Sequence, residues 1–299
     1  MSDDLDFRLV DAFTTRAFAG NRAGVVLDAT GLDDAGRLAI AREVNASETA
    51  FVEPLGGARF RVRFFTPEVE VPLCGHATLS TFLVLASEGK LPSDGRASME
   101  CPAGSIPIET ERSASGWRVR QTQKRPTYRE VPDDAAAVAA WHGLGADDLL
   151  GDIPIQLVST GGPLLLVPVR DAAGLARAKA RPSLAGDQKR LGVSGSLLFT
   201  LDAPTGFRAE VRMLADAVGI AEDPATGIGA GALVAWLARQ GILIPRDGVV
   251  RARFTQGKHV GRPSELDAEA TVDGREVGRV TVAGEGVVTL RGTMSRPRR

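Results

Sequence analysis

The sequence predicts a mixed α/β protein built from two similar lobes. Each half of the chain contains a β-like run that ends at small residues and opens a strongly apolar helix. When the chain is shifted against itself by half its length, Arg63 falls on Arg212 and Cys74 falls on Asp223. Such internal similarity indicates a duplicated unit. We therefore expect two lobes related by a pseudo-twofold axis, with the N-termini of the two helices facing one cleft.

The predicted elements divide the chain into an N-terminal lobe (1–125), a linker (126–150) and a C-terminal lobe (151–299), and they allow the last strand to cross back to the first lobe. Hydrophobic periodicity predicts strands at 7–13, 24–27 and 59–65, a stretch at 44–52 that enters a strand, and helices at 33–43 and 76–89, in the first lobe. In the second lobe it predicts strands within 153–169, 197–201, 207–213 and 249–288, a helical stretch at 171–191 interrupted at Arg181-Pro182, and a helix ending at Gly241.

Composition sets the size and the class of the protein. With 299 residues, 43% of them hydrophobic, the chain can bury one large core or two cores of about 150 residues each. The formal net charge of −1 offers no basic face for a nucleic acid or a membrane surface, and no apolar run approaches the about 18 residues of a membrane span. The two cysteines, Cys74 and Cys101, indicate a reducing, cytoplasmic setting. Together with three scattered histidines they are too few for a zinc site, so we expect no bound metal.

The two central helices are apolar on nearly every face, which predicts that they are buried all round. The first follows Gly75 and ends at Gly89; the second follows Asp223 and ends at Gly241. Small residues in a first helical turn leave backbone N–H groups free, and these groups and the helix dipole favour an anion such as a substrate carboxylate. A plain strand-to-helix turn would show the same pattern.

Glu48 is the candidate catalytic group. It stands where a loop becomes the apolar strand 50–52, so its carboxylate would lose hydration, which favours the protonated form and suits a general acid or base. The corresponding stretch of the second lobe, 194–200, has no acid. A structural need common to both lobes therefore does not explain Glu48, although a solvated glutamate at a strand edge remains the alternative.

Two glycine-containing loops could border the cleft. Gly20-Asn21 is a turn signal that precedes a predicted strand, and Asn21 could reach a cleft at the strand ends, which makes it a candidate for substrate binding. The loop 255–264 contains glycines that allow close backbone approach, so it could cover a site. Ordinary surface turns would explain both loops equally well.

Five stretches of the chain, in the same order, resemble the PhzF family of phenazine biosynthesis proteins. They span nearly the whole sequence and are Gly20-Asn21, Ser47 to Val52, Phe65 to Thr78, Glu222 to Gly227, and Gln256-Gly257 with Gly261 to Ser264. The resemblance implies a diaminopimelate epimerase-like fold, in which each of two α/β lobes is a strand barrel around a buried central helix and the active site lies between the lobes. It also implies a homodimer.

The same resemblance implies a cofactor-independent isomerase of the trans-2,3-dihydro-3-hydroxyanthranilate isomerase type. Glu48 would be the general acid/base that moves a proton on a small cyclic amino or hydroxy carboxylate. His76 and Asp223 would bind and orient the polar groups of the substrate. The backbone N–H groups of Gly75 and Gly227 would hold its carboxylate, as expected at helix N-termini.

Two positions depart from the family pattern. Arg22 stands where proline is common, and Ile228 stands where serine is common. Replacing a hydroxyl by a branched alkyl group removes a hydrogen-bond donor and adds bulk beside the presumed carboxylate. The sequence thus leaves open the actual substrate, as well as the oligomeric state and whether the lobes close on a ligand.

Two other functions are compatible with the sequence. An amino-acid epimerase or racemase would need a base on each face of its substrate, and Cys74 and Asp223 occupy corresponding positions. A carboxylate is a weak base toward a carbon acid, so we favour the isomerase. The third possibility is a non-catalytic small-molecule binding protein, which would have no need of the desolvated acid Glu48.

Overall fold

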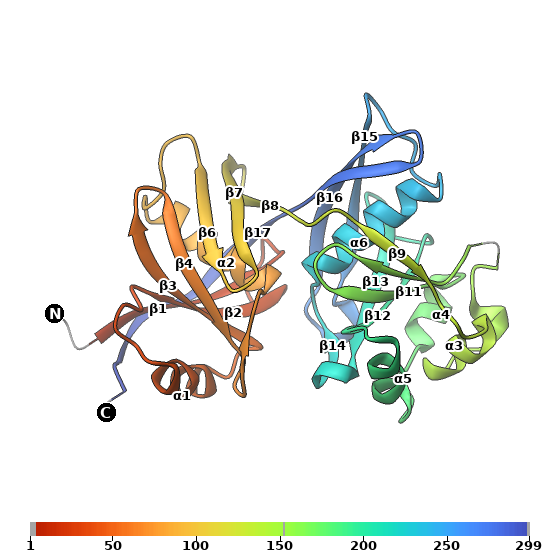
Figure 1. Cartoon of the computed structure of the whole chain (residues 1–299), viewed down its shortest axis with the longest axis horizontal. Coiled ribbons are helices and arrows are strands. Elements are labelled where there is room, and N and C mark those ends of the chain that lie inside the picture. Colours follow the sequence, from red (N-terminus) through yellow and green to blue (C-terminus); the bar gives the residue numbers. More distant parts are fainter. Residues whose placement is uncertain (1–3, 152, 298–299) are drawn as a thin grey trace. The chain divides into compact units, whose positions relative to one another are not determined.

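Figure 1 shows the computed structural model of the chain, which describes residues 4–151 and 153–297. The protein has the mixed α/β fold that the sequence predicts, and it consists of two compact units. The first unit comprises Met1–Thr122 with Ala283–Arg299, and the second comprises Gln123–Val282. Within the described residues, no helix is both long and apolar enough to cross a lipid bilayer.

The first unit is a strand barrel. Its strands are β1 (Asp4–Ala12), β2 (Asn21–Leu27), β3 (Glu48–Gly56), β4 (Arg59–Phe65), β5 (Glu70–Val71), β6 (Arg96–Cys101), β7 (Gly104–Ser113), β8 (Gly116–Thr122) and the end of β17 (Glu276–Ser295). Hydrogen bonds run from β1 through β2, β3, β4, β6, β7 and β8 to β17, and β17 pairs again with β1. The described strands of this circuit close an eight-stranded barrel.

Helix α2 (Gly75–Ser87) lies among the strands of this barrel and contacts β1, β2, β3, β7 and β8. Every residue from His76 to Ala86 is buried, as the apolar sequence predicts, and Gly89 at φ 67° ends the segment. Helix α1 (Asp34–Val44) packs against β3 and β4; Asp33 caps it by accepting a 2.8 Å hydrogen bond from the N–H of Gly36.

The second unit also surrounds a buried helix with strands. It contains β9 (Thr127–Glu130), β10 (Gln156–Ser159), β11 (Pro163–Pro168), β12 (Gly195–Thr200), β13 (Ala209–Ala215), β14 (Ile220–Asp223), β15 (Val249–Gln256), β16 (Ser264–Asp273) and the start of β17. Its helices are α3 (Ala135–Trp141), α4 (Ala172–Arg177), α5 (Leu184–Leu191) and α6 (Gly227–Arg239), with short 3₁₀ turns at Ala146–Asp148, Asp216–Val218 and Lys258–Val260. Helix α6 contacts β10, β11, β15 and β16, and its Trp236 is fully buried, edge-on to Phe199.

Residues 126–150 differ from their expected role as a linker. β9 pairs with β10, and Val138 and Leu144 are buried in the core of the second unit, so this segment belongs to that unit. Its prolines, glycines and acidic residues resemble a linker, whereas the apolar side chains between them are spaced to face a core. The strand that the sequence allowed to cross back is β17, which leaves the second unit at Val282 and enters the first at Ala283.

The two units share a local arrangement just before their buried helices. In the first, Arg63 on β4 binds Glu70 on β5, with the Arg63 Nε to Glu70 Oε1 distance at 2.7 Å. In the second, Arg212 on β13 binds Glu222 on β14 at 2.7 Å, and both side chains are nearly buried. Each ion pair fixes the short strand that leads into a helix N-terminus. This recurrence supports the duplication, and the pseudo-twofold relation itself stays a prediction.

His142 ends helix α3 inside the core of the second unit. It is fully buried; its Nδ1 donates a 2.8 Å hydrogen bond to the carbonyl of Val138, and its Nε2 has no hydrogen-bond partner among the described residues. Burial lowers the pKa of His142 from 6.5 to about 4. The imidazole is therefore neutral in the folded protein at neutral pH.

This burial predicts a loss of stability in mild acid. As the pH falls from 6.5 toward 4, the unfolded chain binds a proton at His142 and the folded chain does not, so the free energy of unfolding decreases across this window. The two pKa values correspond to about 3 kcal/mol. Urea unfolding at several pH values should show this decrease in the wild type and in the control His259→Asn, but a much smaller one in His142→Leu. Equal pH slopes in all three proteins would contradict the assignment.

Candidate active site

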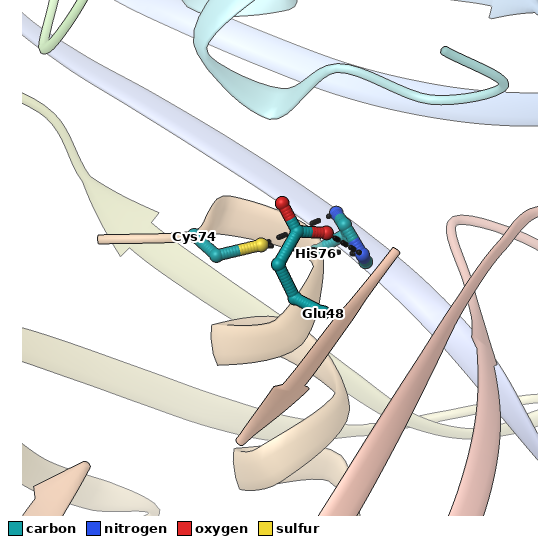
Figure 2. Close-up of side chains that lie close together, drawn as sticks. All are labelled: Glu48, Cys74 and His76. Atoms are coloured by element: carbon teal, nitrogen blue, oxygen red, sulfur yellow. Dashed lines mark hydrogen bonds and ion pairs between the residues drawn. The ribbon is translucent and has the colours of Figure 1, made fainter. Parts of the chain in front are cut away.

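Three side chains with acid/base or nucleophilic character meet at one end of helix α2 (Figure 2). Glu48 is the first residue of β3, Cys74 precedes the first turn of α2, and His76 lies within that turn. Oε2 of Glu48 is 3.3 Å from Nε2 of His76, and Sγ of Cys74 is 3.4 Å from Nδ1 of His76. The side chains of Glu48 and His76 are only 14% and 8% exposed. Glu48 is thus largely buried rather than at a solvated strand edge.

The barrel brings these residues together. β2 and β3 are parallel, with Ala23 opposite Glu48, so Asn21 at the start of β2 lies at the same end of the sheet as Glu48. Helix α2 contacts both strands and begins at this end. Residues distant in sequence therefore meet because three elements begin together.

The hydrogen bonds of His76 indicate its tautomer. Nδ2 of Asn21 is 3.3 Å from Nδ1 of His76, and Oγ of Ser47 is 3.2 Å from Nε2. The Ser47 hydroxyl donates to the carbonyl of Arg22 at 3.3 Å, so toward Nε2 its oxygen acts as an acceptor. With the Asn21 amide as donor, Nδ1 is an acceptor and Nε2 carries the proton. The N–H of His76 then lies on the side of Ser47 and Glu48.

Glu48 has an unusual local environment. Its Oε2 is inaccessible to solvent and forms no hydrogen bond among the described residues; His76 Nε2 lies within ion-pair distance of it. Native proteins seldom leave a buried polar atom without a hydrogen bond unless it has a functional reason. Glu48 is therefore the candidate functional group of this cluster.

The N-terminus of α2 leaves backbone donors near this cluster. Cys74 occupies the N-cap position in an extended conformation, and its side chain accepts no capping hydrogen bond. The first intrahelical bond is from the N–H of Thr78 to the carbonyl of Cys74, so the N–H groups of Gly75, His76 and Ala77 precede the helical ladder. Such a turn can bind an anion.

A second cluster lies at the N-terminus of α6. The Thr226 hydroxyl donates a 2.5 Å hydrogen bond to Oδ2 of Asp223, so it does not cap the helix that begins at Gly227. Gln256 holds both ends of this segment: its Oε1 accepts from the N–H of Thr226 at 3.2 Å, and its Nε2 donates to the carbonyl of Asp223 at 2.7 Å. The Asp223 carboxylate is consequently held at a fixed position in its unit.

The loop that follows Gln256 supports the same segment. Ser264, which pairs with Gln256 across β15 and β16, donates to the carbonyl of Pro224 at 2.9 Å. Gly257 adopts φ 79°, and a Cβ there would lie 2.5 Å from the same carbonyl oxygen, so only glycine fits. The expected close backbone approach in this loop is therefore made to residues 223–226.

The predicted site residues fall into two groups. Asn21, Glu48, Gly75 and His76 gather in the first unit, whereas Asp223 and Gly227 lie together in the second. Ser47, Thr226 and Gln256 are further polar residues of these two clusters that were not predicted individually, and all three lie inside the motifs that carry the resemblance. Their hydroxyl and amide groups are the sequence features that could have indicated a role in binding.

The side chains of Glu48, Cys74 and His76 in the first unit could together hold a metal ion. One donor atom each from Glu48, Cys74 and His76 lies within 4.8 Å of the others. The expectation that no metal binds counted cysteines and histidines only, and it left out the carboxylate that β3 brings to them.

Comparison with known proteins places the chain in a family. The family model described as "Phenazine biosynthesis-like protein" matches residues 10–292. An uncharacterized isomerase, YddE of Escherichia coli O157:H7, is 35% identical over 93% of this chain and 94% of its own. The trans-2,3-dihydro-3-hydroxyanthranilate isomerase of Pseudomonas fluorescens is 33% identical over 97% of this chain and 99% of its own.

A solved structure agrees with this placement. The crystal structure of a PhzF-family phenazine biosynthesis protein from Bacillus anthracis matches with a TM-score of 0.89 at 27% identity, over 98% of this chain and 99% of that one. The isomerase class expected from the sequence is the class that both sequence relatives carry in their names. On the extent of these matches, the chain belongs to the PhzF family.

Proposed function

We propose that this protein is a cofactor-independent isomerase that moves a proton on a small cyclic amino or hydroxy carboxylate, of the trans-2,3-dihydro-3-hydroxyanthranilate type. The observation that carries the proposal is the buried Oε2 of Glu48, which has no hydrogen bond among the described residues and lies 3.3 Å from the His76 imidazole. The relative from Pseudomonas fluorescens supports the reaction type.

A single carboxylate is sufficient for this chemistry. Glu48 removes a proton from one ring carbon, the electron pair of the broken C–H bond shifts through the conjugated system, and the protonated Glu48 returns the proton to a second carbon on the same face. No oxidation or reduction takes place. The N–H of His76 Nε2 lies near Glu48 and faces its ionised carboxylate before the first transfer and after the second.

The remaining predicted residues act in binding. We assign the substrate's polar groups to Asn21, His76 and Asp223, and its carboxylate to the free N–H groups at Gly75 and Gly227. The uncapped first turns of α2 and α6 support this assignment. The expected homodimer is part of the proposal, and sedimentation analysis would check it.

An epimerase that uses Cys74 and Asp223 is the second candidate, favoured by the contact between the Cys74 thiol and His76 at 3.4 Å. The 2.5 Å hydrogen bond from Thr226 already occupies Oδ2 of the Asp223 carboxylate, so this candidate ranks lower. Deuterium incorporation at an amino-acid stereocentre from heavy water would support it.

Glu48→Gln should abolish turnover, by at least about 1,000-fold, because the amide keeps the shape of the side chain and cannot exchange a proton. Proton NMR of trans-2,3-dihydro-3-hydroxyanthranilate with the protein in deuterated buffer measures the loss of the diene signals. The control Glu68→Gln removes an exposed carboxylate of the same unit and should turn over as the wild type does. Unchanged turnover in Glu48→Gln would exclude Glu48 as the base.

Gln256→Ala should lower both stability and turnover. It leaves the Thr226 N–H and the Asp223 carbonyl without their side-chain partner, which costs about 1–3 kcal/mol of unfolding free energy and loosens the Asp223 carboxylate. Gln256→Glu keeps an acceptor for Thr226 and loses the donor to Asp223, so it should fall between the wild type and Gln256→Ala. Denaturant unfolding measures the loss of stability and kcat measures the loss of turnover. Full activity of Gln256→Ala would show that the hydrogen bonds of Gln256 to Thr226 and Asp223 have no role in turnover.

Ile228→Ser should raise kcat/KM for trans-2,3-dihydro-3-hydroxyanthranilate about tenfold, since it adds a hydroxyl donor and removes bulk in the first turn of α6. The Ile228 side chain packs on the Gly161-Gly162 turn, where added Cβ atoms would lie 3.5 and 3.2 Å from it, so its methyl groups fill this space. The control Ile228→Ala removes bulk without adding a hydroxyl. If Ile228→Ser does not improve turnover, Ile228 is not what limits this substrate.

A further inference from the structure

We propose that Glu48, Cys74 and His76 also form a binding site for Zn²⁺, and that the bound ion reversibly inactivates the enzyme. The donors are a carboxylate oxygen, a thiolate sulfur and an imidazole nitrogen, all within 4.8 Å of one another (Figure 2). This site extends beyond the isomerase chemistry, because it concerns what the cluster binds when no substrate is present.

The separations of the donor atoms suit tetrahedral zinc. Zinc–ligand bonds of about 2.0–2.3 Å at tetrahedral angles place neighbouring donors about 3.4–3.6 Å apart. Nε2 of His76 is 3.3 Å from Oε2 of Glu48 and 3.9 Å from Sγ of Cys74. The Glu48–His76 separation is close to the required length and the Cys74–His76 separation is slightly longer. The donor atoms of Glu48 and Cys74 lie within 4.8 Å of each other, so the side chains move together when zinc binds.

The chemistry of the donors selects the ion. Thiolate and imidazole favour zinc over magnesium or calcium, which prefer oxygen ligands. Three protein ligands leave a fourth position for water, as in open zinc sites. The Cys74 thiol passes its proton to solvent on binding, and the resulting thiolate and the Glu48 carboxylate then neutralise the divalent charge.

Two further features favour binding. The buried Oε2 of Glu48, which has no hydrogen bond among the described residues, gains a ligand bond. When Nε2 binds zinc, the imidazole proton resides on Nδ1, and the Asn21 amide 3.3 Å away can rotate to present its oxygen as acceptor. Such an outer hydrogen bond is usual for a histidine that binds a metal.

Inactivation follows from the identity of the ligands. A Glu48 carboxylate bound to zinc cannot take up a proton from a substrate carbon. The Glu210–His259 pair of the second unit provides an internal comparison, because its Oε1 to Nε2 distance of 3.1 Å is similar. There Nζ of Lys258 lies 3.6 Å from the same Glu210 oxygen, and this cation opposes binding of another.

The test measures Zn²⁺ binding to the full-length protein by competition with a chromophoric chelator, and records the spectrum of the Co²⁺-loaded protein. We expect one Zn²⁺ per chain, a thiolate-to-Co²⁺ charge-transfer band, and binding weakened at least about 100-fold in Cys74→Ser. Cys101→Ser and His259→Asn are the matched controls and should bind as the wild type does. These readouts do not depend on substrate, so they stand even if the proposed isomerase reaction fails.

Unaltered Zn²⁺ affinity in Cys74→Ser, absence of the charge-transfer band, or loss of binding in His259→Asn would overturn the proposal. Alkylation of the wild-type protein, quantified by mass spectrometry, covers the case in which Cys74→Ser does not fold. Zn²⁺ should protect Cys74 and leave Cys101 as reactive as before, and equal alkylation of Cys74 with and without Zn²⁺ would also overturn the proposal. If the isomerase activity is established, Zn²⁺ should abolish it and a chelator should restore it.

Discussion

The burial of helix α2 inside a closed barrel is the constraint on which the first unit depends. A helix with apolar residues on every face is stable only where strands surround it, and its 13 residues leave the first turn at one end of the barrel. At that end the N–H groups have no side-chain cap, and the strands β2 and β3 begin. Because the apolar helix must be buried in the barrel, its uncapped N–H groups lie at the same end as the side chains of Asn21 and Glu48.

The second unit meets the same constraint with different side chains. α6 is as apolar as α2, and Thr226 turns its hydroxyl to the Asp223 carboxylate rather than to the helix end. Gln256 and Ser264 then hold the segment before the helix through backbone groups. In both units an arginine–glutamate pair fixes the short strand just upstream, with Arg63–Glu70 in one and Arg212–Glu222 in the other. The arginine–glutamate pair before the helix is therefore common to both units, whereas the chemical groups at the N-termini of the two helices differ.

The buried helices and their ends could be predicted from the sequence, because they depend on hydrophobic periodicity and on the residues that terminate helices. The two buried helices and their terminal glycines, Gly89 and Gly241, follow from apolar runs and from turn chemistry. The place of residues 126–150 could not be predicted in this way, because a core contact such as that of Val138 depends on partners far along the chain. The contact of Glu48 with His76 and the hydrogen bonds of Gln256 to residues 223–226 are likewise tertiary, since only the packing of distant segments brings these atoms into range.

The burial of Glu48 bears on both of its proposed roles, as a base and as a metal ligand. Its Oε2 is buried without a hydrogen bond among the described residues, and either a proton or a cation can occupy that place. The proposed isomerase reaction uses the proton. The Cys74 thiol, with Sγ 3.9 Å from Nε2 of His76, and the imidazole, with Nε2 3.3 Å from Oε2 of Glu48, supply the remaining donors that zinc prefers. The two proposals therefore use the same three side chains, and a substrate bound at Glu48 would compete with zinc for them.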